Sequence, residues 1–237
     1  ASYSNGAQVD YGEWSYRTGL SWQPDDYRHY YLAFSDSFNP TADLYQFTTT
    51  STVYPAERSR TVELGAKWEL MEGNLSLRTS LYRASKKYER NTDIDSAGTA
   101  QLLSNRRHTD GLELEAAGRI APNWEVFGGV AFMKARIDEQ AAGQSTALVG
   151  MRPRNSPPYT ASLWSTYRLA GGWRVGAGVE AKGARLAYGL GANAPSPNVA
   201  PRYQRWDAMV AYEQKRYSLK LNVLNLLNKR YYDSIYE

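Results

Sequence analysis

Cysteine is absent from this 237-residue sequence, and histidine occurs only at His29 and His108. The lack of cysteine excludes disulfides, thiolate catalysis and cysteine-ligated metal sites. A metal site built on histidine needs several histidines and carboxylates that converge, and two separated histidines do not provide this. We therefore expect that the chain binds no metal or other cofactor of its own.

Long hydrophobic runs are also missing. No stretch of roughly 18 apolar residues occurs, which excludes a membrane-spanning helix. Hydrophobic residues make up 42% of the chain and the mean hydropathy is −0.60. These values are compatible with a membrane β-barrel, because alternation hides its apolar surface in a polar average. The net charge is only +4, without a basic stripe, so we expect no nucleic-acid partner.

What the sequence has instead is a series of runs in which apolar and polar residues alternate. In residues 61–70, Val62 and Leu64 fall on one face. Glu63 and Lys67 fall on the other face, as expected for a strand with one apolar and one wet side. We expect ten strands, over residues 13–24, 27–40, 58–70, 74–92, 101–120, 124–138, 157–169, 173–188, 201–213 and 217–232.

Such strands could belong to a soluble antiparallel sandwich, whose strands alternate in the same way. Three features favour a membrane barrel. The runs exceed the roughly 5–6 residues of soluble strands and reach the about 9–11 residues of a tilted membrane strand. Short turns such as residues 71–73 alternate with long connections such as residues 41–57 and 139–156, as in outer-membrane barrels. Tryptophan and tyrosine flank the short turns, where an interfacial aromatic girdle would lie.

The end of the chain carries the most specific motif. After an alternating start, residues 217–233 continue as Leu-Asn-Val-Leu-Asn-Leu-Leu-Asn-Lys-Arg-Tyr-Tyr. This run resembles the "N-x-x-N-L-(F/L)-(N/D)-K-x-Y" signature near the end of TonB-dependent outer-membrane receptors, and among them it is closest to the siderophore receptors. In residues 55–68, the glutamate that follows proline in the family stands one place late. The segments that resemble further motifs of this family are residues 14–24, 30–41, 55–68, 110–115 and 153–166.

The resemblance implies an all-β fold, a transmembrane antiparallel β-barrel of 22 strands. Residues 1–237 would form a partial barrel domain with about ten C-terminal strands. The N-terminal plug, the first half of the barrel and the last strand would lie outside this chain. The resemblance also implies a place in the bacterial outer membrane, among lipid and lipopolysaccharide.

The function implied by the resemblance is import of a ferric siderophore, nearest to the catecholate type, with the iron carried inside the siderophore. The TonB energy-coupling complex would act through the missing N-terminal part, and the chain would not be an enzyme. Another bulky nutrient, such as cobalamin or a glycan, remains open as the cargo. A barrel enzyme would need a nucleophile beside a base, and although His108 and Asp110 share a strand face, no nucleophile is evident.

Ferric siderophores are often anionic and carry flat aromatic groups, so basic and aromatic residues near the outside loops are candidate ligand contacts. The alternative for each is a solvated loop residue or a basic residue that faces lipopolysaccharide. The densest basic cluster is Arg106-Arg107-His108, which we expect to contribute first. The candidates are Arg106, Arg107, Arg90, Tyr88, Arg152, Arg154, Tyr45, Phe47, Tyr54 and Tyr188.

Overall fold

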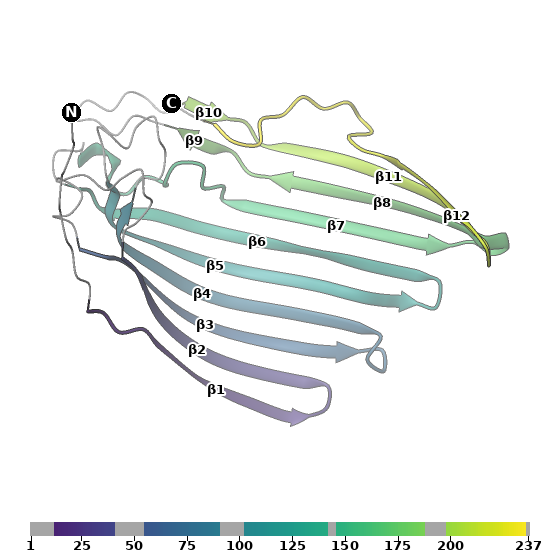
Figure 1. Cartoon of the computed structure of the whole chain (residues 1–237), viewed down its shortest axis with the longest axis horizontal. Coiled ribbons are helices and arrows are strands. Elements are labelled where there is room, and N and C mark those ends of the chain that lie inside the picture. Colours follow the sequence, from purple (N-terminus) through teal and green to yellow (C-terminus); the bar gives the residue numbers. More distant parts are fainter. Residues whose placement is uncertain (1–11, 41–54, 91–101, 142–145, 188–197, 236–237) are drawn as a thin grey trace, which may run out of the picture.

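The computed structural model describes residues 12–40, 55–90, 102–141, 146–187 and 198–235. In this part of the chain, ten strands form one curved antiparallel sheet with the order β1-β2-β3-β4-β5-β6-β7-β8-β11-β12 (Figure 1). The ten strands are β1 (Tyr16–Asp25), β2 (Arg28–Asn39), β3 (Glu57–Leu70), β4 (Leu75–Arg90), β5 (Leu102–Ala121), β6 (Trp124–Glu139), β7 (Tyr159–Arg168), β8 (Trp173–Lys182), β11 (Tyr203–Glu213) and β12 (Ser218–Val223). The ten predicted strands are therefore confirmed as an all-β, antiparallel fold.

Two of the predicted strands end earlier than the sequence pattern indicates. The expected strand 173–188 is interrupted, because β8 stops at Lys182 and β9 (Arg185–Ala187) pairs instead with β10 (Asn198–Ala200). The expected strand 217–232 is wrong beyond Val223.

The physical reason for the early end of β12 lies in two asparagines of the terminal motif. Asn225 and Asn228 adopt left-handed backbone conformations, with φ of 52° and 48°. Asparagine tolerates this conformation better than most residues, but a strand cannot continue through it. The Asn225 side chain closes the turn, since its Nδ2 donates to the Lys229 carbonyl and its Oδ1 accepts from the Lys229 amide. The repeated asparagines of the motif therefore form a turn.

The two ends of the sheet differ, as the connection lengths predict. Short hairpin turns lie at one end, on the right of Figure 1, and the strand ends that lead into the long connections lie at the other end. We call these the turn end and the loop end. Among the described residues, no helix is long and apolar enough to cross a membrane.

The register of the sheet collects large apolar side chains on one face, which we call the outer face. Opposed residues of antiparallel strands point to the same side, so a row of partners marks one face. One such row consists of exposed residues from six consecutive strands: Leu20, Leu32, Leu64, Leu81, Leu112 and Phe132.

Buried apolar packing in the described part of the chain is small by comparison. Its main cluster holds only Ile137 and Leu148, with Leu103, Met151 and Leu186 packed against them. Water would penalise the exposure of the outer face, at roughly 25 cal/mol per Å² of apolar surface. This cost disappears when the outer face contacts an apolar surrounding, as the lipid-facing surface of a membrane barrel does.

Aromatic residues occupy the outer face at the turn end. Trp22 stacks on Tyr30 with ring centroids 5.3 Å apart, and Trp68 meets Tyr30 edge-on at 6.2 Å. Across the sheet, Trp173 lies 4.7 Å from Tyr212. Amphipathic rings favour the level of lipid headgroups, so this belt marks one boundary of the apolar band.

Candidate functional site

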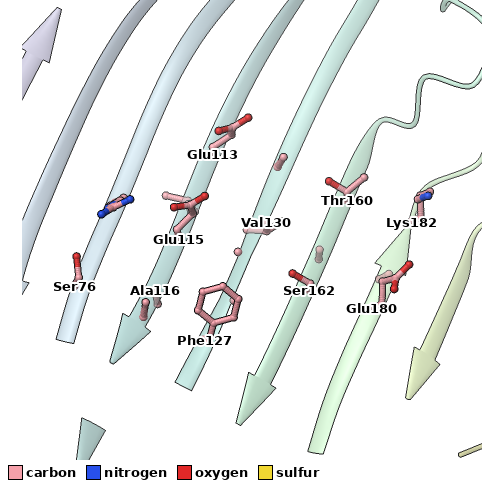
Figure 2. A pocket seen from close by; sticks show the side chains of 18 residues that line it. Ser76, Glu113, Glu115, Ala116, Phe127, Val130, Thr160, Ser162, Glu180 and Lys182 are labelled. Carbon is pink, nitrogen blue, oxygen red and sulfur yellow. The ribbon is translucent and has the colours of Figure 1, made fainter. Parts of the chain in front are cut away.

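The face opposite the apolar rows, which we call the inner face, carries an open hollow of about 670 Å³ (Figure 2). Side chains of β4 to β8 surround it. Because successive side chains of a strand alternate between faces, the polar members of each strand reach the hollow together. Its polar lining consists of Ser76, Arg78, Glu113, Glu115, Thr160, Ser162, Glu180 and Lys182.

The charges around this hollow are of both signs. Arg78 stands opposite Glu115 in the register of β4 and β5, and Glu113 lies two residues along the strand. On the far side, Glu180 and Lys182 project from β8. The hollow therefore presents a polar wall of mixed charge, which suits water, a polar protein segment or a polar cargo in contact with it.

Aromatic rings of the inner face lie over glycines of the neighbouring strands. Tyr31 covers Gly65 and Tyr82 covers Gly111, so closely that an added Cβ at either glycine would overlap the ring. The Tyr31 hydroxyl donates to Glu63 Oε1. These glycines therefore serve close packing, in agreement with the account that sequence reasoning gives of glycines inside strands.

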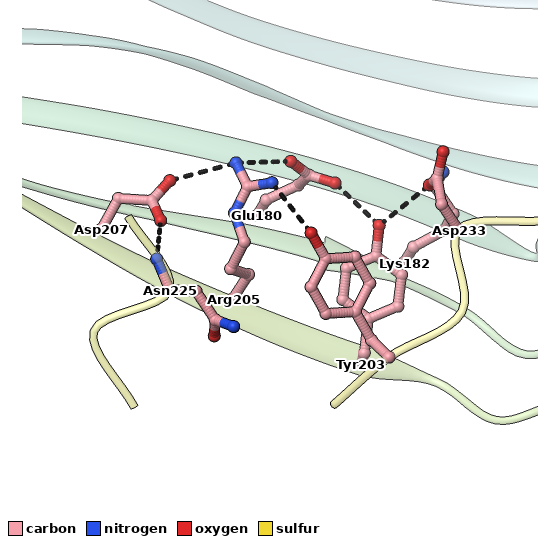
Figure 3. Close-up of polar contacts among 8 residues, drawn as sticks. Glu180, Lys182, Tyr203, Arg205, Asp207, Asn225 and Asp233 are labelled. Carbon is pink, nitrogen blue, oxygen red and sulfur yellow. Dashed lines mark hydrogen bonds and ion pairs between the residues drawn. The ribbon is translucent and has the colours of Figure 1, made fainter. Parts of the chain in front are cut away.

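At the loop end of β8 and β11, the inner face carries a polar network (Figure 3). Arg205 Nη2 lies 3.1 Å from Glu180 Oε2 and 3.1 Å from Asp207 Oδ2. The Tyr203 hydroxyl donates to Glu180 Oε1 at 2.8 Å. Asp207 also accepts from the Asn225 amide at 2.7 Å, and thereby ties the network to the turn after β12.

The segment after that turn folds back against the same network. Lys182 Nζ donates to Asp233 Oδ1 at 2.5 Å, and this hydrogen bond holds the pKa of the Asp233 carboxyl below its usual range. Tyr231 stacks on Tyr203 with centroids 4.4 Å apart, and the Arg185 guanidinium donates to the Tyr232 carbonyl. Sequence reasoning missed these contacts. Their only signal was a run of aromatic and charged residues after the asparagine turn.

The structure brings two of the predicted ligand residues together near the loop end. Arg107 and Arg154 line one cavity of about 60 Å³ with Glu89 and Ser104. Arg107 Nη2 pairs with Glu89 Oε1 at 2.5 Å, so its charge is already balanced within the wall.

Other predicted ligand residues do not line this cavity. Arg90 is buried, and its Nη2 donates to the Pro55 carbonyl at 3.0 Å. Arg152 Nη1 donates to the Ala184 carbonyl at 3.1 Å, and Tyr88 stands at a left-handed position of β4 with φ of 52°. Four further candidates fall outside the described residues: Tyr45, Phe47, Tyr54 and Tyr188. The ligand roles of all these residues stay predictions.

The basic cluster Arg106-Arg107-His108 is divided between the two faces of the sheet. Arg107 belongs to the inner face with Glu89, whereas Arg106 and His108 alternate to the outer face. His108 Nδ1 lies 2.7 Å from Asp138 Oδ1, and its Nε2 lies 3.9 Å from Asp110. Histidine therefore stands between two carboxylates.

Two kinds of site found in other barrels are not evident in the described residues. No group of three or more histidine, aspartate or glutamate side chains is arranged to hold a metal ion there. Ser85 is the residue opposite His108 in the register, but no hydrogen bond between the two occurs in the described part. The described geometry supplies a polar wall and an open hollow.

Comparison with known proteins finds similarity over most of the chain. The family model "TonB dependent receptor-like, beta-barrel" matches residues 1–226. A "Probable TonB-dependent receptor BfrD" of Bordetella pertussis is 30% identical over 246 residues, covering 99% of this chain and 32% of that protein. The "Catecholate siderophore receptor Fiu" of Escherichia coli K12 is 30% identical over 221 residues, covering 91% of this chain and 27% of that protein.

A solved structure agrees with the sheet described above. The crystal structure of the siderophore receptor PiuA from Acinetobacter baumannii matches with a TM-score of 0.79 and 25% identity, covering 94% of this chain and 33% of that chain. The chain thus spans about a third of the length of these relatives.

Proposed function

Because the chain belongs to the family of TonB-dependent receptor β-barrels, we propose that it forms part of the wall of a receptor importing a ferric siderophore across the outer membrane. The observation that carries the proposal is the two-faced sheet, with exposed apolar rows outside and a charged hollow inside. Relatives named as siderophore receptors support the choice of cargo.

In this proposal, the chain performs no bond chemistry. The apolar rows and the aromatic belt hold the wall in the membrane, with the loop end outside the cell and the turn end in the periplasm. Residues at the loop end capture the ferric complex, and the TonB energy-coupling complex acts on a part of the receptor that precedes this segment. The polar inner face then lines the route of the released cargo.

Two charged features of the inner wall suit an anionic, aromatic cargo. Arg107 and Arg154 lie together at the loop end, and Lys182 and Arg185 lie beside the stacked ring of Tyr203. Guanidinium and ammonium groups pair with anionic oxygens, and an aromatic ring stacks on a catechol ring. These side chains also hold the wall together, so a contact with cargo would compete with their present ion pairs.

The test is a binding titration with the full-length receptor in detergent, followed by quenching of tryptophan fluorescence. Ferric complexes of catecholate, hydroxamate and citrate type are added separately, with cobalamin as the control. Saturable quenching by one ferric class, with a Kd of about 1 µM or below, supports the proposal. A response to cobalamin alone, or to none of the ferric complexes, overturns the assignment of a siderophore while leaving the membrane barrel intact.

A further inference from the structure

Residues 231–235, which we call the strap, pass over the polar network at the loop end of β8 and β11. The strap brings together the two chemical features expected of the cargo. Tyr231 supplies a flat ring, which stacks on Tyr203 with centroids 4.4 Å apart and planes inclined by 25°. Asp233 supplies an anionic oxygen, which lies 2.5 Å from Lys182 Nζ and 3.2 Å from the Tyr203 hydroxyl (Figure 3). The strap therefore presents an aromatic ring and an anion two residues apart.

The cations of the network meet the strap as they would meet a catecholate. The phenol oxygen of Tyr231 accepts a hydrogen bond from Arg205 Nη1 at 3.3 Å. A catecholate oxygen occupies the same position on a flat ring and would accept this bond with a full negative charge. The hydrogen bond from Lys182 is the main cause of the lowered pKa of the Asp233 carboxyl, and the charge of Arg185 lowers it further. Two cations therefore act on the anion of the strap and a third acts on its ring oxygen.

Arg185 lies beneath the strap with part of its hydrogen-bonding capacity unused. It is only 1% exposed, and its guanidinium carbon lies 5.5 Å from the centre of the Tyr203 ring. Its Nη2 donates to the Tyr232 carbonyl, but Nε and Nη1 are buried without a hydrogen-bond partner within the described part of the chain. Buried polar groups nearly always have a partner, and a buried charge normally has an opposite charge beside it. The strap therefore satisfies Arg185 only in part, and an anion with more oxygens would satisfy it better.

The contacts that hold the strap are polar and partly exposed. The Ile235 amide donates to Asn155 Oδ1 at 3.0 Å, and Asn155 Nδ2 donates to the Ile235 carbonyl at 2.8 Å. The Asp233 side chain is 71% exposed in its pair with Lys182. Ion pairs exposed to this extent contribute little to stability. A ligand that brings its own ring and a stronger anion can therefore displace the strap.

We propose that Tyr203, Lys182 and Arg185 form a site for an aromatic anion of the catecholate class, and that the strap fills this site in the free protein. The ring of the cargo takes the place of Tyr231 on Tyr203. Its anionic oxygens replace Asp233 at Lys182 and reach Nε and Nη1 of Arg185. Because the site is competent only when the strap is released, the strap lowers the apparent affinity for the cargo. This inference rests on the proposed function, to which it adds an internal competitor of the cargo.

The experiment measures binding of 2,3-dihydroxybenzoate, a simple catecholate, to the full-length receptor in detergent by equilibrium dialysis. Asp233→Asn should bind it about two- to fivefold more tightly, the factor that corresponds to one exposed ion pair. Asp25→Asn is the matched control, because it removes the carboxylate of an exposed ion pair with Arg28 at the turn end. Its affinity should equal that of the unchanged receptor. If Asp233 only supports the wall, its substitution would weaken binding or leave it unchanged, and either result overturns the proposal.

A second variant releases the strap without any change of charge. Asn155→Gly removes both hydrogen bonds to Ile235, and glycine accepts the left-handed φ of 52° at this position. It should bind 2,3-dihydroxybenzoate about threefold to tenfold more tightly. In the unchanged receptor, the bound catecholate should speed hydrogen exchange of the Ile235 amide. Tighter binding by Asp233→Asn but not by Asn155→Gly would be a general effect of charge and overturns the role of the strap.

The remaining outcomes separate this inference from the proposed function. Absence of 2,3-dihydroxybenzoate binding to every variant overturns the site. Equal affinity of a ferric catecholate for the unchanged receptor, Asp233→Asn and Asn155→Gly also overturns it, but leaves the siderophore receptor standing. If no ferric complex binds while 2,3-dihydroxybenzoate still binds Asn155→Gly more tightly, the site is supported and the siderophore assignment fails.

Discussion

At the scale of single residues, the inner face depends on close contact between glycines and aromatic rings. Tyr31 lies over Gly65 from the neighbouring strand and is held there by its hydrogen bond to Glu63. A side chain at position 65 would have to displace the ring. Tyr31 of the neighbouring strand therefore restricts position 65 to glycine. The residue pattern within β3 alone does not reveal this restriction.

We predict that Gly65→Ala lowers the free energy of unfolding of the full-length receptor by about 1–3 kcal/mol, as overpacking usually does. The measurement is urea unfolding of the protein folded into lipid vesicles. Gly12→Ala is the control, because no atom of the described residues beyond its chain neighbours lies within 4 Å of a Cβ built there. In the background of Tyr31→Ala, the cost of Gly65→Ala should fall. An equal cost in both backgrounds would contradict the packing account.

The basic cluster illustrates what sequence can and cannot predict about the site. Strand alternation alone would have separated Arg106 from Arg107, since neighbours on a strand point to opposite faces. Their partners could not be predicted, because Glu89 reaches Arg107 from β4 and Asp138 reaches His108 from β6. Contacts between strands depend on register, and register is not written in either strand alone.

At the scale of strands, the two faces should respond oppositely to the same substitution. Leu163 on β7 belongs to the outer face, and the adjacent Ser162 lines the hollow. We predict that Leu163→Lys lowers the free energy of unfolding in lipid vesicles by about 2–4 kcal/mol, the usual cost of a cation facing the hydrocarbon. Ser162→Lys is the matched variant and should cost less than about 1 kcal/mol. Equal costs for the two would mean that the faces are wrongly assigned.

The strands themselves were largely predictable from the sequence. Ten alternating runs correspond to the ten strands of the large sheet, and the short turns fall where the pattern breaks. The alternation pattern predicted the structure wrongly at two places, where other interactions determine the backbone path. After Val223, the backbone conformations of Asn225 and Asn228 decide the structure. After Lys182, pairing of β9 with β10 replaces pairing with the sheet.

At the scale of the whole molecule, the tryptophans report how the sheet sits in the membrane. Trp124 lies on the outer face at the turn end, where its Nε1 donates to Ser165 Oγ at 2.7 Å. Trp164 lies on the inner face, packed against Gly178. In single-tryptophan variants of the full-length receptor, we predict that brominated lipids quench Trp124 at least several-fold more than Trp164. The reverse order would show that the inner face contacts lipid.

The order of the large sheet has a consequence for how such a wall is assembled. Every strand in it pairs with the strand next to it in that chain order, apart from the small β9–β10 ribbon. Each new strand can therefore pair with the exposed edge of the strand that precedes it in the sheet, and it needs no partner distant in sequence. The entropic cost of each addition grows slowly with the connecting length, so that three doublings correspond to about 2 kcal/mol. Hairpins closed by short turns should consequently form as units. Pairing of one hairpin with the next should be slower, because a longer connection has to be closed.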